Sequence, residues 1–125
     1  MEESNMFPIL SKEMLRKRTS LAPESMKAWM NFSNTVFKEG ALSEKTKHLI
    51  ALAVAHVTQC PYCIRAHTKE SMRMGASKEE MMEAIWVASE MRSGAALAHS
   101  ALSMDEMENE ELIIFPFSKI IRISK

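Results

Sequence analysis

The stretch KTKHLIALAVAHVTQCPYCIRAHTKE, residues 45–70, contains both cysteines of the chain and three of its four histidines. Its first half is apolar on every side between Leu49 and Ala55, a pattern typical of a helix buried at the centre of a domain. Ser43 stands where an N-cap residue would begin that helix. The sequence therefore predicts a central helix over about residues 44–57.

A second helix is predicted directly after a short turn at residues 58–60. Pro61 suits the first turn of a helix, where no backbone N–H is needed, and Gly75 is a typical residue for its end. Cys60 would then be the N-cap of a helix over about residues 61–74. We expect the two helices to form an antiparallel hairpin that carries the Cys-x-x-Cys motif.

Glycine and proline are sparse elsewhere, and they fall at the ends of segments, which favours helices. A capping box at residues 77–80 predicts a helix that Gly94 interrupts or ends, and the small apolar residues from Ala95 predict another. We therefore expect an all-α domain of about six helices, over about residues 9–18, 23–38, 44–57, 61–74, 78–94 and 95–104.

The end of the chain has a different character. Residues 111–125 are rich in β-branched and aromatic side chains, and Pro116 would break any helix there. Exposure of so apolar a segment to water is unfavourable. We expect an extended tail that folds back on the domain or lies across a partner subunit.

Length and charge limit the possible functions. A chain of 125 residues suits one domain, residues 1–125, with its core at about residues 20–110. The formal net charge is zero, so nothing in the composition favours nucleic-acid binding. The longest apolar run, residues 49–55, is too short to span a membrane, and the acidic start of the chain is unlike a secretory signal. We expect a cytoplasmic protein with no membrane partner.

Cys60 and Cys63 are too close in sequence to staple distant parts of a secreted scaffold, so redox or metal chemistry is the better interpretation. At a helix N-terminus the Cys60 sulfur would lie among unpaired backbone N–H groups, which favour the thiolate over the thiol. Cys63, in the first turn, would be close enough to form a disulfide with Cys60. Reversible oxidation of the pair is therefore expected.

His67 follows Cys63 by one helical turn, so its imidazole could take or return a thiol proton. In an antiparallel hairpin His48 would lie about 15 Å from the turn and His67 about 9 Å from it, a mismatch that two side chains can span. His48 is therefore a candidate partner that orients or charges His67. The candidate catalytic residues are Cys60, Cys63, His67 and His48.

This spacing resembles that of the AhpD-like, carboxymuconolactone decarboxylase superfamily, whose peroxidase members carry Glu-x11-Cys-x2-Cys-x3-His on a helical hairpin. Cys60, Cys63 and His67 match the motif, and the resemblance runs from about Leu42 to the segment around Gly94. It implies an all-helical domain, assembled as homo-oligomeric trimers or hexamers, and antioxidant, thiol-dependent reduction of hydroperoxides or disulfides. It also implies that Cys63 attacks the substrate and that Cys60 resolves it as the intramolecular disulfide.

The chain departs from the family motif at His48, where the motif has glutamate. A neutral imidazole supplies no fixed negative charge to hold His67 protonated. We expect weaker peroxidase activity or chemistry moved toward disulfide exchange. As the resemblance implies that the decarboxylase branch works without the cysteine pair, the two thiols argue against lactone decarboxylation.

Two further hypotheses concern what the site binds. His56, Cys60, Cys63 and His67 offer two nitrogen and two sulfur ligands, enough for a tetrahedral zinc site, so a non-enzymatic oligomerisation or zinc-binding module is the alternative function. No nucleotide or flavin motif is visible. For the enzyme we therefore expect no bound cofactor and an external dithiol as electron donor.

Overall fold

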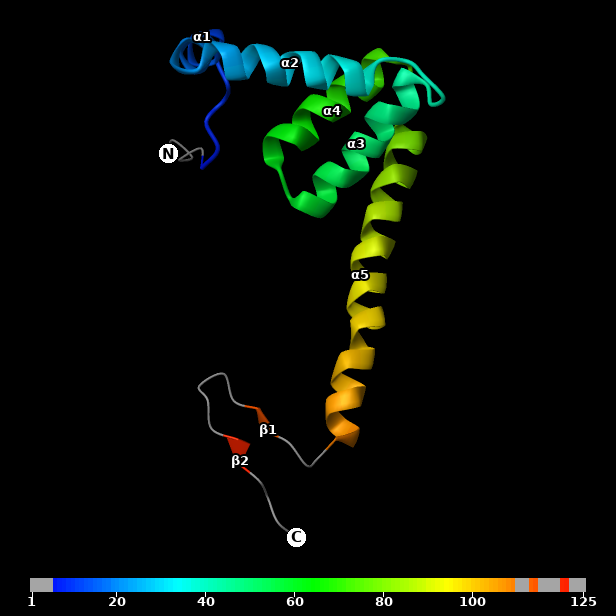
Figure 1. Ribbon diagram of the computed structural model, residues 1–125. Coiled ribbons are helices and arrows are strands. Elements are labelled where there is room, and N and C mark those ends of the chain that lie inside the picture. The colour runs from blue at the N-terminus through cyan, green and yellow to red at the C-terminus, as the bar shows by residue number, and fades with distance from the viewer. Residues whose placement is uncertain (1–5, 110–112, 115–119, 122–125) are drawn as a thin grey trace, which may run out of the picture. The chain divides into compact units, whose positions relative to one another are not determined.

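The structure, a computed structural model, describes residues 6–109, 113–114 and 120–121 (Figure 1). Within these residues it has five helices and a pair of two-residue strands: α1 (Lys12–Leu21), α2 (Pro23–Phe37), α3 (Glu44–Thr58), α4 (Pro61–Arg73), α5 (Lys78–Glu108), β1 (Ile113–Ile114) and β2 (Ile120–Ile121). The strands are antiparallel, with Ile113 opposite Ile121. The expected all-α class is confirmed, and the rest of the predicted tail lies outside the described residues.

Local signals explain where the first two helices begin. The Oγ of Ser11 accepts a hydrogen bond from the N–H of Met14 at 3.1 Å, so α1 begins at Lys12 and not at residue 9 as predicted. Ala22 lies outside the helical conformation, with φ −152° and ψ 69°, because the residue before a proline is disfavoured in that conformation. Pro23 then opens α2, as expected.

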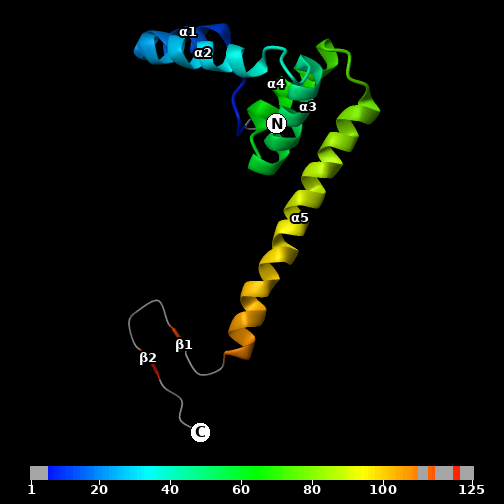
Figure 2. The same cartoon turned by 45° about the vertical axis from the view of Figure 1, so that its right-hand side comes forward.

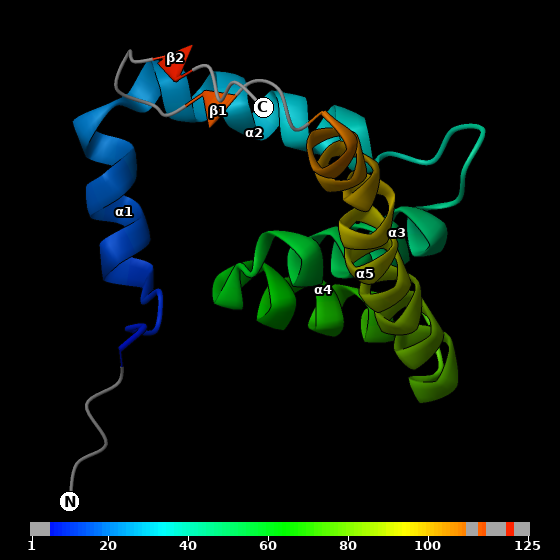
Figure 3. The same ribbon diagram turned by 90° about the horizontal axis from the view of Figure 1, so that it is seen from below.

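The central hairpin of α3 and α4 forms as predicted, and the two helices run antiparallel, side by side (Figures 1 and 3). They pack against each other more extensively than any other pair of elements in the described chain. Leu52 of α3 and Ser71 of α4 are fully buried, and Ala55 is 2% exposed. The buried part of the hairpin thus combines one large apolar side chain, Leu52, with the small side chains of Ala55 and Ser71.

α5 is one helix where the sequence predicted two. α5 is drawn as one continuous helix in Figure 2, and its range, Lys78–Glu108, includes Gly94. Glycine costs a helix about 1 kcal/mol relative to alanine, too little to end it when alanine and other good helix formers lie on both sides. The described residues therefore form five helices where about six were predicted, because the two helices predicted on either side of Gly94 are one.

The chain divides into two units, Met1–Ala88 and Ser89–Lys125. The single domain expected over residues 1–125 stays a prediction. Met81 and Ala88 of α5 are buried in the first unit. In the second unit every described residue of α5 apart from Gly94 is exposed in the single chain. Among the described residues, no helix is both long enough and apolar enough to cross a membrane.

Candidate functional site

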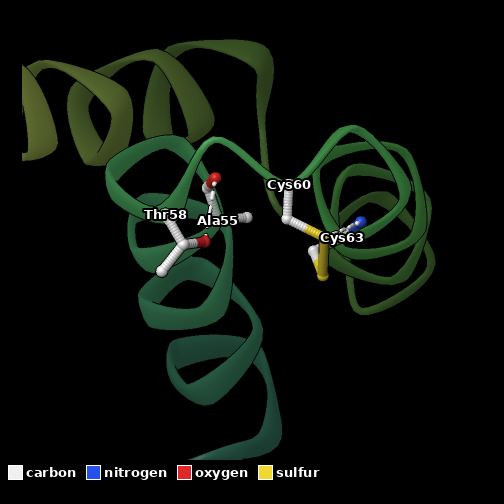
Figure 4. The surroundings of a disulfide bond; sticks show 4 residues. All are labelled: Ala55, Thr58, Cys60 and Cys63. Carbon is white, nitrogen blue, oxygen red and sulfur yellow. Dashed lines mark hydrogen bonds between the residues drawn. A yellow bond between two sulfur atoms is a disulfide. The ribbon is translucent and has the colours of Figure 1, made fainter. Parts of the chain in front are cut away.

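The site begins at the turn between α3 and α4. Gln59 adopts the left-handed conformation, with φ 56° and ψ 45°, and its N–H donates to the carbonyl of Ala55. The N–H of Cys60 donates to the same carbonyl at 3.1 Å, and the Thr58 hydroxyl approaches it at 3.4 Å (Figure 4). Three donors thus converge on one carbonyl at the end of α3. The chain reverses at once, and α4 begins directly after Cys60.

Cys60 is the N-cap of α4, as predicted, with Pro61 in the first turn. Its Sγ accepts a hydrogen bond from the backbone N–H of Cys63 at 3.2 Å. Cys60 and Cys63 form a disulfide, and their Cα atoms are 5.3 Å apart (Figure 4). Both residues are half-buried, so exposure does not distinguish them. The disulfide therefore spans the first turn of α4.

The hydrogen bond to the Cys60 sulfur also affects the cysteines in their reduced state. A backbone N–H aimed at sulfur stabilises the thiolate more than the thiol, and the positive end of the α4 dipole acts in the same direction. Cys60 therefore has a donor in place that favours its thiolate once the disulfide opens.

The two predicted histidines come together across the hairpin. The Nδ1 atoms of His48 on α3 and His67 on α4 are 3.3 Å apart. Two neutral imidazoles can share this hydrogen bond only if one carries its proton on Nδ1 and the other on Nε2. His48 is 8% exposed, whereas His67 is half-buried. The pair therefore joins a buried imidazole to one that lies closer to the surface.

Phe37, the last residue of α2, covers both imidazoles. Its ring stacks on His48 at a centroid distance of 4.6 Å and 11° between planes, and on His67 at 5.2 Å and 23°. No sequence motif identified Phe37 as part of the site. Its place over the histidine pair depends on how α2 meets the hairpin, which no local pattern specifies.

Burial lowers the pKa of His67 below its ordinary value of 6.5, and the nearby His48 lowers it further. Glu70, one turn further along α4, raises the pKa of His67 and so acts in the opposite direction. Arg73 donates to Oε2 of Glu70 at 2.6 and 3.0 Å, and this hydrogen bonding lowers the pKa of Glu70. Sequence analysis missed Glu70, although its spacing of three residues from His67 was a signal.

The remaining predicted relationships are not all formed. His56 donates from Nδ1 to the carbonyl of Leu52 in its own helix at 2.8 Å. In the described part of the chain no three His, Cys, Asp or Glu side chains gather as a metal site would require, so the proposed zinc ligands are not assembled. That His67 serves Cys63, four residues earlier on α4, stays a prediction.

Comparisons with known proteins place the chain in a family. The sequence model of the carboxymuconolactone decarboxylase family matches residues 23–106, which include α2, the hairpin and most of α5. The chain belongs to this family. The resemblance to the AhpD-like superfamily is thereby confirmed.

Relatives of this family member include solved structures. A carboxymuconolactone decarboxylase family protein from Legionella pneumophila is 34% identical, with a TM-score of 0.62, over 78% of this chain and 87% of that one. A protein from Methanobacterium thermoautotrophicum is 32% identical, with a TM-score of 0.64, over 66% of this chain and 93% of that one. An uncharacterised protein of the cox locus of Paracoccus denitrificans is 60% identical over 58% of this chain. The match spans 66% of that relative, just under two thirds of its length.

Proposed function

We propose that this family member is a thiol-dependent oxidoreductase that reduces hydroperoxides or disulfides through Cys60 and Cys63. The observation that carries the proposal is the disulfide across the first turn of α4, with the N–H of Cys63 directed at the Cys60 sulfur. One fold therefore accommodates the oxidised pair and offers a donor to the reduced pair. A site that alternates between the two states needs both properties.

With a hydroperoxide the proposed reaction has two steps. The Cys63 thiolate, whose proton His67 has taken, attacks the distal peroxide oxygen, so that an S–O bond forms and the O–O bond breaks. The leaving alkoxide receives the proton from His67 and departs as an alcohol. The Cys60 thiolate then attacks the sulfenic acid on Cys63, forming the disulfide and releasing hydroxide, which takes up the proton that Cys60 lost and becomes water.

An external dithiol then reduces the pair. Its thiolate attacks the Cys63 sulfur, and Cys60 leaves as the thiolate, because the N–H of Cys63 stabilises charge on that sulfur. The second thiol of the donor resolves the mixed disulfide. The two electrons that reduce the peroxide therefore come from the donor, which matches the absence of any nucleotide or flavin motif in the sequence.

His48 takes part by determining which ring nitrogen of His67 carries the proton. For Nε2 of His67 to accept the thiol proton, its Nδ1 must carry a proton and donate it to Nδ1 of His48. His48 thus performs by hydrogen bonding the orienting role that glutamate has in the family motif, without the charge. Glu70 supplies a negative charge nearby. It raises the pKa of His67, as the missing glutamate would.

We also propose that the chain works as a homo-oligomer, a trimer or a hexamer. Large apolar side chains are exposed along the second half of α5, among them Leu97, Leu102 and Met104. A helix of this kind gains stability only when its apolar residues are covered.

Thiol titration tests the proposed reaction. The reduced protein should show two free thiols, and one equivalent of hydroperoxide should remove both as the disulfide forms. Cys63→Ser should abolish the reaction, whereas Cys60→Ser should leave a sulfenic acid at Cys63 that mass spectrometry detects. His67→Ala should slow the reaction by about 10²–10⁴-fold, the contribution of a general acid or base. Two thiols that persist after peroxide and after an aromatic disulfide reagent would refute the proposal.

A further inference from the structure

The end of α2, which carries Phe37, is held by a lysine of the next helix. Nζ of Lys47 on α3 donates to the carbonyl of Val36 at 2.8 Å and to the carbonyl of Lys38 at 2.5 Å. These carbonyls belong to the two residues on either side of Phe37. The ammonium group therefore fixes the backbone immediately before and after the aromatic ring.

This contact also satisfies groups that the helix leaves unpaired. The last carbonyls of a helix have no partner within it, and they form the negative end of its dipole, where a cation is favoured. Lys47 is half-buried, and a Cβ added to Gly40 in the following loop would lie 3.8 Å from its Nζ. The ammonium group thus lies close to both the end of α2 and the loop that leads to α3.

Lys47 and His48 are neighbours on α3, and they reach the same short segment of α2 in different ways. Lys47 contacts the backbone, and His48 contacts the Phe37 ring. The same ring then lies over His67 of α4. Phe37 is therefore located by a polar contact on its backbone and in turn covers the imidazole pair.

We propose that Lys47 is a positioning residue, whose ammonium group keeps Phe37 stacked over the hydrogen-bonded pair of His48 and His67. The stacked ring keeps water from the pair and limits rotation of both imidazoles. It thereby holds the Nδ1 to Nδ1 hydrogen bond on which proton transfer depends. This role rests on the proposed function of His67.

The other groups that act on His67 are known, so their effects can be separated from that of Lys47. His48 faces it from α3, Glu70 acts from α4 with Arg73 as its partner, and α2 presents the uncharged Phe37. Burial is the largest of the influences that lower the pKa of His67. If the ring loosens, water reaches the imidazole and the pKa of His67 rises.

A double-mutant cycle with Lys47→Met and Phe37→Ala tests this role. Titrations of the His67 and His48 ring protons and nitrogens by NMR are recorded on the oxidised protein without substrate, so the result does not depend on catalysis. Each single variant should raise the titration midpoint of His67, and Lys47→Met should move the ring-proton signals away from their shielded positions over Phe37. In the Phe37→Ala background, Lys47→Met should add little, because both changes act through the same ring.

Two further variants separate positioning from charge and from general destabilisation. Lys47→Arg keeps donors for both carbonyls and should restore the wild-type titration. Lys45→Met removes a positive charge two residues earlier on α3, where Lys45 forms an exposed ion pair with Glu80 at 2.7 Å, and it should leave the His67 titration unchanged. In the thiol reaction Lys47→Met should lower the rate by up to about 10²-fold, the effect of a small misplacement at a reacting centre.

The outcomes distinguish this inference from the proposed function. An unchanged His67 titration in Lys47→Met, or an equal shift with and without Phe37, would overturn the positioning role, because the lysine would then act independently of the ring. Far-UV circular dichroism of each variant reports whether the helices are retained. If the NMR cycle gives the expected coupling while the wild-type thiols do not react with peroxide or disulfide, the positioning role stands and the proposed function fails.

Discussion

At the scale of single residues, the most informative departure from the family motif is the histidine at position 48. A glutamate there would hold a proton on His67 by its charge, whereas His48 shares a hydrogen bond of 3.3 Å with His67 and supplies no negative charge. Burial and the nearby His48 both lower the pKa of His67. His67 therefore takes up a proton less readily than an imidazole in water.

This residue-scale property predicts how stability depends on pH. Because burial and His48 lower the pKa of His67 in the folded protein, the unfolded chain binds a proton there more readily. The contribution of His67 to stability should be fully present above pH 6.5, the ordinary pKa of the side chain, and should be lost as the pH falls through the lower pKa of the folded state.

Urea unfolding of the wild type and of His67→Gln between pH 8 and pH 5 measures this contribution. Below pH 6.5 the unfolding free energy of the wild type should fall relative to that of His67→Gln. A difference between wild type and His67→Gln that is constant across this range would contradict the assignment.

At the scale of elements, the turn between α3 and α4 decides where the cysteines lie. Gln59 occupies the left-handed region, which costs a residue with a Cβ roughly 1–2 kcal/mol relative to glycine. Its position allows the N–H groups of Gln59 and Cys60 to converge on the Ala55 carbonyl. The helical hairpin thus places a strained residue next to the N-cap that carries the first sulfur.

Gln59→Gly should therefore stabilise the folded protein. Relief of the left-handed strain should outweigh the roughly 0.4–1 kcal/mol by which the greater freedom of glycine favours the unfolded chain. We expect a net gain of about 0.5–1 kcal/mol in unfolding free energy, measured by urea denaturation of the oxidised protein. Gln59→Ala keeps the Cβ and serves as the control, without this gain. Equal stabilities of the glycine and alanine variants would show that the backbone conformation of residue 59 carries no such cost.

At the scale of the whole molecule, the described chain buries few large side chains for its length. Leu52 and Met81 are the largest apolar residues among the buried ones described, whereas Leu97 is 75% exposed and Leu102 is 67% exposed. Residues seven apart share a helix face, so Leu97 and Met104 lie on the same side of α5. The proposed homo-oligomer would cover such surface, and the covered area would add the hydrophobic stabilisation that the single chain lacks.

Leu97→Glu should accordingly weaken self-association. The side chain is exposed in the single chain, so the substitution should leave the helices of one subunit intact while it places a charge in the apolar contact between subunits. Multi-angle light scattering should give a trimer or hexamer for the wild type and smaller species for the variant. Ser103→Glu adds the same charge at an exposed polar position of α5 and should have less effect. A compact wild-type monomer would refute the assembly proposal.

The sequence by itself determined the features that depend on neighbouring residues. Ser43 as a cap, Pro61 in a first turn and Cys60 as an N-cap predicted α3, α4 and the turn between them, because capping and proline geometry act within one helical turn. Helix rise and antiparallel pairing were also enough to predict that His48 and His67 meet. The interruption predicted at Gly94 was wrong, since a weak local preference was outweighed by the helix formers around it.

Only the tertiary structure decided what surrounds the paired histidines. Phe37 contacts both imidazoles because Lys47 holds the end of α2 through a hydrogen bond to the Val36 carbonyl. Lys47 and Val36 are eleven residues apart in sequence, and no periodic pattern encodes that contact. The influence of Glu70 on His67 likewise depends on how deeply the hairpin buries the imidazole and on the pairing of Glu70 with Arg73. Proton affinity follows from burial and from charges brought together by folding. The positions of the candidate site residues were therefore predictable from sequence, while the proton affinity of His67 was not.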